Sequence, residues 1–162
     1  MKKIETDVLA LLKDDSRLTV AAMANMLGQN EKVIAETVER LEKKGVIVKY
    51  TVISDDEKAE SEIVEALIEV RVSPTCKNGF DSIAEEISQH DEVKSVYLMS
   101  GAYDLVIIIE GKTLKEIAMF VSEKLSGIDK VLSTATHFIL KKYKLSGVRM
   151  SADSASRQAI HP

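Results

Sequence analysis

Residues 19–47, TVAAMANMLGQNEKVIAETVERLEKKGVI, predict two helices joined by a tight turn. Thr19 is suited to cap the first helix, and Gly28 stands where a helix end favours the left-handed conformation. Asn30 is suited to cap the second helix, whose first turn carries an acidic residue beside the positive end of the dipole. The expected buried stripe of this second helix is Ile34, Val38 and Leu41.

The residues on either side of this stretch complete a small domain. A helical stripe of Ile4, Val8, Leu11 and Leu12 precedes it and ends at the polar residues 14–16. Residues 46–52, VIVKYTV, are rich in β-branched side chains and too short for a helix, so they predict a β ribbon. Three helices followed by a ribbon are typical of a winged helix-turn-helix, which we expect to span residues 1–53.

The rest of the chain has a different pattern of polar and hydrophobic residues. Residues 54–62, SDDEKAESE, are polar and acidic and predict a linker. Residues 63–144 predict the order βαββαβ, with strands at 63–72, 93–99, 104–110 and 131–140 and helices at 80–87 and 114–125. This order is that of a ferredoxin-like sandwich, so the expected fold class is α+β. One sheet face would stay uncovered, and we expect it to form a dimer interface.

The C-terminal residues 145–162 lack a hydrophobic period. We expect them to form a tail that is either mobile or docked on a neighbouring subunit.

Composition excludes several classes of protein. The chain has 162 residues with 45% hydrophobic residues and a net charge of -4, and no stretch is long and apolar enough to span a membrane. We expect a cytoplasmic protein. The single cysteine, Cys76, excludes an internal disulfide and a cysteine-based zinc site. The three histidines lack metal-ligand spacing and no catalytic motif is present, so we expect no metal, no cofactor and no enzymatic activity.

The exposed side of the helix after Asn30 carries candidate contacts to double-stranded DNA. Asn30, Lys32, Thr37 and Arg40 could reach base edges or phosphates, and Lys43, Lys44 and Lys49 could neutralise phosphates. The first 62 residues nevertheless hold ten basic and thirteen acidic residues. The alternative is therefore a metabolite-sensing interaction protein whose solvated helical head binds a protein partner instead of DNA.

The segment Gly101-Ala-Tyr-Asp104 joins two predicted strands. Its backbone amides could hold an α-carboxylate and Asp104 an α-ammonium, and Thr134 and Thr136 could add hydroxyl contacts. Leu98 and Met99 could line the side-chain pocket. A plain hairpin in which the aspartate caps the turn is the alternative, and an enzyme that uses Asp104 in an active site is a more distant one.

Both halves of the chain resemble one family. Residues 7–24, DVLALLKDDSRLTVAAMA, and 38–47, VERLEKKGVI, resemble the helix-turn-helix of the leucine-responsive and asparagine-responsive (Lrp/AsnC, or feast/famine) regulators. The second half, with GAYDL at 101–105 and TAT at 134–136, resembles the amino-acid-sensing RAM domain of that family. Where this helix-turn-helix commonly reads Gly-Leu-Ser, the present chain has Gly28-Gln-Asn30, and Thr37 replaces a usual basic residue.

This resemblance implies a transcriptional regulator that binds promoter DNA. It implies homodimers that pair through their sheets and assemble into larger rings, often octamers, with a small effector, usually an amino acid, bound between dimers. The effector site that it implies consists of Ser100, Gly101, Tyr103, Asp104, Thr134 and Thr136.

Overall fold

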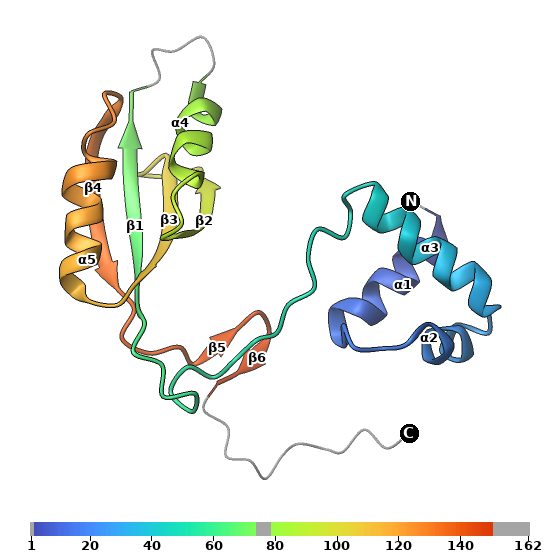
Figure 1. Cartoon of the computed structure of the whole chain (residues 1–162). Coiled ribbons are helices and arrows are strands. Elements are labelled where there is room, and N and C mark those ends of the chain that lie inside the picture. Colours follow the sequence, from blue (N-terminus) through green and yellow to red (C-terminus); the bar gives the residue numbers. More distant parts are fainter. Residues whose placement is uncertain (1, 74–78, 151–162) are drawn as a thin grey trace. The chain divides into compact units, whose positions relative to one another are not determined.

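A computed structural model of the chain describes residues 2–73 and 79–150. The chain divides into two compact units, Met1–Ile53 and Ser54–Pro162, and each is described by itself (Figure 1). Cys76 and residues 151–162 lie outside the described residues.

The first unit consists of three helices, α1 (Lys3–Asp14), α2 (Val20–Leu27) and α3 (Glu31–Lys43) (Figure 1). The predicted caps are confirmed: Thr19 Oγ1 accepts a hydrogen bond from Ala22 N, and Gly28 adopts the left-handed conformation with φ of +60°. The helices enclose a small core of Val8, Met23, Ala24, Ile34 and Leu41.

The predicted ribbon at residues 46–52 is wrong for the isolated chain. Within the described residues 2–53 all regular structure is helical. A strand needs a hydrogen-bonding neighbour, and no other segment of this unit is extended alongside these residues. Ile47 packs against the helical core, but Val48 and Val52 remain 88% and 80% exposed.

The second unit has the predicted βαββαβ order. Its elements are β1 (Val64–Val72), α4 (Gly79–Ser88), β2 (Val93–Leu98), β3 (Leu105–Gly111), α5 (Leu114–Met119), which continues as the π-helical segment η1 (Phe120–Leu125), and β4 (Val131–Phe138). The four strands form an antiparallel sheet in the order β2-β3-β1-β4. The α+β fold class is therefore confirmed.

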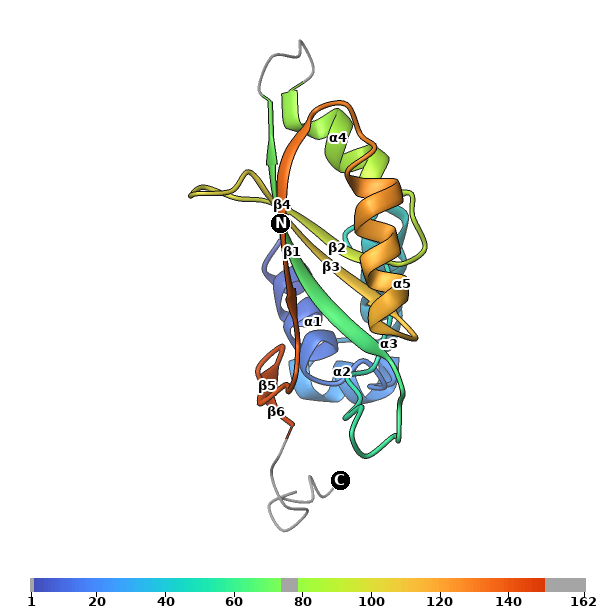
Figure 2. The same cartoon turned by 90° about the vertical axis from the view of Figure 1, so that its left-hand side faces the viewer.

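Helices α4 and α5 lie on the same face of this sheet (Figure 2). Alternate residues of β1 and β3 point to them and are buried, together with apolar side chains of the helices. The opposite face, which we call the open face, carries Leu67 opposite Ile108 and Tyr97 opposite Val106. Apolar side chains thus line both sides of the sheet, although helices cover only one.

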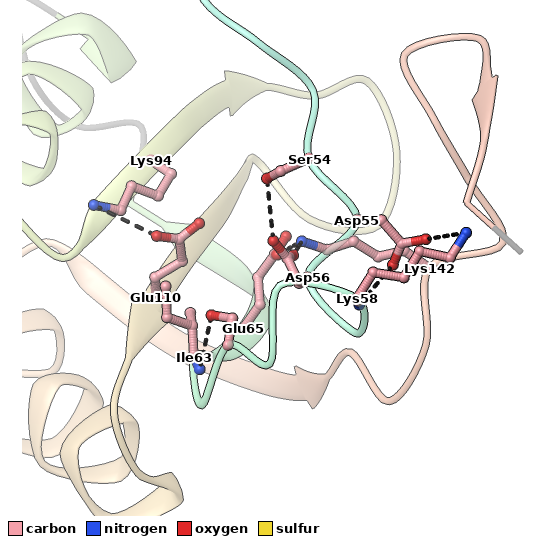
Figure 3. Close-up of polar contacts among 10 residues, drawn as sticks. Ser54, Asp55, Asp56, Lys58, Ile63, Glu65, Lys94, Glu110 and Lys142 are labelled. Atoms are coloured by element: carbon pink, nitrogen blue, oxygen red, sulfur yellow. Dashed lines mark hydrogen bonds and ion pairs between the residues drawn. The ribbon is translucent and has the colours of Figure 1, made fainter.

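The predicted linker is fastened to the sheet unit. Lys142, which follows β4, forms ion pairs with Asp56 of the linker, at 2.9 Å, and with Glu65 of β1 (Figure 3). Ser54 Oγ in turn donates a hydrogen bond to Asp56 Oδ1 at 3.4 Å (Figure 3). Lys142 therefore joins the linker to β1 through one carboxylate of each.

The tail expected from residue 145 begins with regular structure. Strands β5 (Lys144–Leu145) and β6 (Val148–Arg149) form a short antiparallel hairpin, and Met150 N donates a hydrogen bond to Tyr143 O. Gly147, with φ of +88°, allows the tight turn between them. Two residues per strand are too few for a hydrophobic period, which is why the sequence pattern missed them.

Candidate functional site

Helix α3 presents its N-terminal turn to solvent. Asn30 Oδ1 accepts a hydrogen bond from Lys32 N at 2.8 Å, so the side-chain oxygen of Asn30 serves as the cap. Asn30 is exposed, and its amide group is also a hydrogen-bond donor. Lys32 is exposed and has no ion-pair partner among the described residues. This end of α3 can therefore approach a negatively charged ligand.

Thr37 does not belong to this exposed surface, contrary to the prediction. Its side chain is 1% exposed, donates a hydrogen bond to Val33 O at 2.8 Å and accepts one from Arg40 Nη2 at 3.2 Å. The reason is helical geometry: Thr37 lies three residues after Ile34 and four before Leu41, on the buried stripe itself.

Arg40 is engaged within the unit. Its Nε atom lies 3.0 Å from Glu5 Oε1, and their side chains are 38% and 6% exposed. Hydrogen bonds from Lys2 N and from Arg40 hold the pKa of the Glu5 carboxyl below its usual range. The ion pair joins α1 to α3, so Arg40 has a structural role that the sequence pattern did not indicate.

The three predicted phosphate-binding lysines lie at or after the C-terminal end of α3. Lys43 Nζ pairs with Glu39 at 2.5 Å, and Lys44 Nζ lies 4.0 Å from Glu5. Lys49 is exposed on the segment after the helix. Tyr50 Oη donates a hydrogen bond to Glu42 Oε1 at 2.9 Å, and this contact, which sequence reasoning missed, fastens that segment to α3.

The second candidate site is the turn between β2 and β3, residues 99–104. Met99 N donates to Asp104 O at 2.8 Å and closes the turn, while Ser100 and Gly101 are exposed at its tip. Figure 2 shows that this connection extends away from the helices, on the side of the open face. Leu98 and Met99 expose their side chains beside it.

Asp104 and Arg71 organise this turn together with β1. The Asp104 Oδ2 atom accepts a hydrogen bond from Val72 N at 2.9 Å, at the point where the register of β1 with β4 shifts. Arg71 Nη2 donates to Ala102 O at 2.8 Å, and its guanidinium lies 5.7 Å from the centre of the Tyr103 ring. Sequence reasoning missed Arg71, although a basic residue in an apolar strand was a visible signal.

The two predicted threonines are not brought to this turn within one chain. Thr134 and Thr136 pair with Val70 and Ile68, whose side chains are buried against the helices. They therefore share the helix-covered face, with β1 between β4 and β3. In one chain, β1 therefore separates the two threonines from Asp104.

Metal-binding clusters and membrane-spanning helices are both absent from the described residues. Residues 2–73 and 79–150 hold no group of three or more histidine, cysteine, aspartate or glutamate side chains placed to bind a metal ion. None of the helices in these ranges is long and apolar enough to cross a bilayer.

Comparison with known proteins identifies the family. Residues 1–48 match the model of winged helix-turn-helix DNA-binding domains, and residues 65–148 match that of the Lrp/AsnC ligand-binding domain. The HTH-type transcriptional regulator YugG of Bacillus subtilis, which is uncharacterized, is 43% identical over 98% of this chain and 96% of its own length. The chain therefore belongs to the Lrp/AsnC family of DNA-binding transcriptional regulators, with a ligand-binding domain and no enzymatic activity.

Solved structures agree with this fold. Escherichia coli AsnC is 19% identical with a TM-score of 0.68, covering 90% of this chain and 95% of its own. A transcriptional regulator from Neisseria meningitidis, NMB0573, solved as a complex with L-Met, is 19% identical with a TM-score of 0.71, covering 93% and 97%.

Proposed function

We propose that this regulator binds promoter DNA through the exposed N-terminal turn of α3 and that an amino acid modulates this binding. Lys32 and the amide nitrogen of Asn30 would approach base edges or phosphates, and Lys43, Lys44 and Lys49 would contact the backbone on either side. Arg40 contributes indirectly, because its ion pair with Glu5 fixes the angle of α3 against α1.

The observation that carries the effector proposal is that Arg71 and Asp104 both lie at the 99–104 turn, where each forms a hydrogen bond with a backbone group. An amino acid is a zwitterion, and this turn holds a guanidinium and a carboxylate within two neighbouring strands. The Asp104 Oδ1 atom would receive the α-ammonium, and the free N–H groups of Arg71 with the turn amides would receive the α-carboxylate. The L-Met complex of the Neisseria protein supports the same class of ligand.

We further propose that the effector lies between copies of the chain. Thr134 and Thr136 would then come from a second copy, because β1 separates them from the turn of their own chain. Dimers that pair through the open face and assemble into larger rings such as octamers would supply these contacts. An effector that binds one assembly more tightly than another would shift their populations and change the spacing of the DNA-binding units.

The experiment is DNA binding to the upstream region of the protein's own gene, titrated against salt with and without the twenty amino acids. A steep fall of affinity with salt, together with a shift of the midpoint by at least one amino acid, is expected. A midpoint that no amino acid shifts would contradict the effector proposal alone. Absence of binding at low salt, on this and a second promoter, would contradict the DNA interface.

A further inference from the structure

A cavity of about 560 Å³ opens where β3 ends and α5 begins. Its floor consists of the buried residues Ile109, Ile117 and Phe120, and the half-exposed side chains of Ile63 and Met119 stand at its edge. We call it the β3–α5 cavity. Its volume and its apolar floor are those of a small-molecule site.

The β3–α5 cavity is distinct from the proposed effector site. The 99–104 turn precedes β3, whereas the cavity lies at the far end of this strand. Four residues of β3, 105–108, lie between the turn and Ile109, the first residue of this strand that lines the cavity, so Asp104 and Ile109 are roughly 17 Å apart along the strand. A ligand in the cavity would therefore leave Asp104 free.

The rim of the cavity carries an excess of negative charge. Lys94 Nζ lies 3.6 Å from Glu110 (Figure 3). Lys124 Nζ lies 2.5 Å from Glu92, so two of the lysines at the rim are already paired. Glu123 is exposed and forms no ion pair within the described part of the chain. The full set of charged lining residues is Asp91, Glu92, Lys94, Glu110, Lys112, Glu116, Glu123 and Lys124.

A rare backbone conformation builds one wall. The helix that begins as α5 continues from Phe120 to Leu125 as a π-helix, which is uncommon and frequent at functional sites. This segment supplies Phe120, Glu123 and Lys124 to the cavity. His90 packs edge-on against the Phe120 ring with 5.5 Å between centroids, so the ring is held in place.

We propose that the β3–α5 cavity is a second small-molecule site of this regulator and that it takes a compact amine with an apolar body. The apolar body would lie on Ile109, Ile117 and Phe120, and the ammonium would face Glu123 at the rim. Five carboxylates against three lysines disfavour an anionic ligand of the same shape.

Tryptamine is a suitable probe, because the chain contains no tryptophan and indole fluorescence therefore reports only the ligand. Indole-3-acetate has the same ring system and the opposite charge. The full-length chain is expected to bind tryptamine about tenfold more tightly than indole-3-acetate, the effect of one charged contact. Equal affinities, or no saturable binding of tryptamine, would overturn the proposal.

Four variants locate the site. Glu123→Lys reverses the free charge and Met119→Arg fills the cavity from a half-exposed position, and each is expected to weaken tryptamine binding about tenfold. Two control variants should leave the affinity for tryptamine unchanged. Glu86→Lys lies on the exposed side of α4 and outside the cavity, and Asp104→Ala lies in the proposed effector site. Circular dichroism confirms that each variant is folded. Binding that survives both cavity variants, or that Asp104→Ala abolishes, contradicts the assignment.

Discussion

At the residue scale, Asp104 combines a structural contact with the proposed ligand contact, and one substitution separates them. Asp104→Asn retains an oxygen that accepts from Val72 N but removes the negative charge. We expect thermal stability to change little and the affinity for the effector amino acid to fall about tenfold or more, since a hydrogen bond to a charged group contributes about 1.5–3 kcal/mol. Calorimetric titration measures the affinity for the effector amino acid. An unchanged affinity would show that the Asp104 carboxylate has a structural role only.

The Glu5–Arg40 ion pair predicts a pH dependence of stability. The folded state lowers the pKa of Glu5, so its stabilising effect is complete above the pKa of the unfolded chain and is lost as pH falls through the folded value. Glu5→Gln should therefore lower the melting temperature at neutral pH, with the difference from the unaltered chain shrinking in acid. Glu36→Gln, an exposed α3 carboxylate, is the control. A difference that is independent of pH would show that charge is not the cause.

At the scale of elements, the sequence predicted the helix ends correctly but not the pairing of a strand. The α2–α3 boundary followed from Thr19, Gly28 and Asn30, because caps and left-handed ends depend on neighbouring residues alone. Residues 46–52 have strand composition but form no strand, because pairing requires a partner that a local pattern does not specify. The burial of Thr37 could have been predicted from its place on the buried stripe of α3. It was instead expected on the exposed side because its side chain is polar.

The cap of α3 should contribute measurably to the stability of its unit. Asn30→Ala removes the acceptor for Lys32 N, and loss of such a cap costs about 1 kcal/mol. Asn30→Asp keeps an acceptor and should be close to neutral, and Gln29→Ala is a neighbouring control outside the cap. Chemical denaturation followed by circular dichroism measures all three. Equal losses for Asn30→Ala and Asn30→Asp would argue against the cap as the cause.

The exposed N-terminal turn of α3 predicts a distinct effect on DNA binding. Lys32→Ala should weaken binding and reduce the slope of log affinity against log salt by about one, because one phosphate contact releases about one counterion. Lys115→Ala is matched in charge and exposure but lies on α5 in the sheet unit, and we expect the slope to stay unchanged. A slope unaffected by Lys32→Ala would remove this residue from the interface.

At the scale of the whole molecule, the sequence indicated the sheet and its uncovered face, but not which site residues come together. Arg71 and the turn residues are adjacent in one chain, whereas Thr134 and Thr136 lie on the opposite face of the same sheet. Strand order and side-chain alternation decide this, and neither follows from the spacing of a motif. The resemblance implies one effector site that includes both groups, and this remains a prediction that a single chain does not test.

The open face predicts how assembly can be disrupted without unfolding the chain. Leu67 and Ile108 are directly opposite each other on the two central strands, and their side chains are only partly buried in a single copy. Ile108→Asp would place a charge in the centre of a face that pairing removes from water, whereas in one chain it remains solvated. Light scattering is therefore expected to show a shift from a multiple of 17.9 kDa to the mass of one chain.

The same variant tests whether assembly supports DNA binding. A single chain carries one helix-turn-helix and holds one half-site, so its affinity for promoter DNA should fall while circular dichroism stays unchanged. Ser88→Asp, at the exposed end of α4 on the covered side of the sheet, introduces the same charge and should change neither mass nor affinity. An Ile108→Asp variant that keeps the original mass would assign the dimer contact to another surface, and the effector site between copies would then need a different pair of faces.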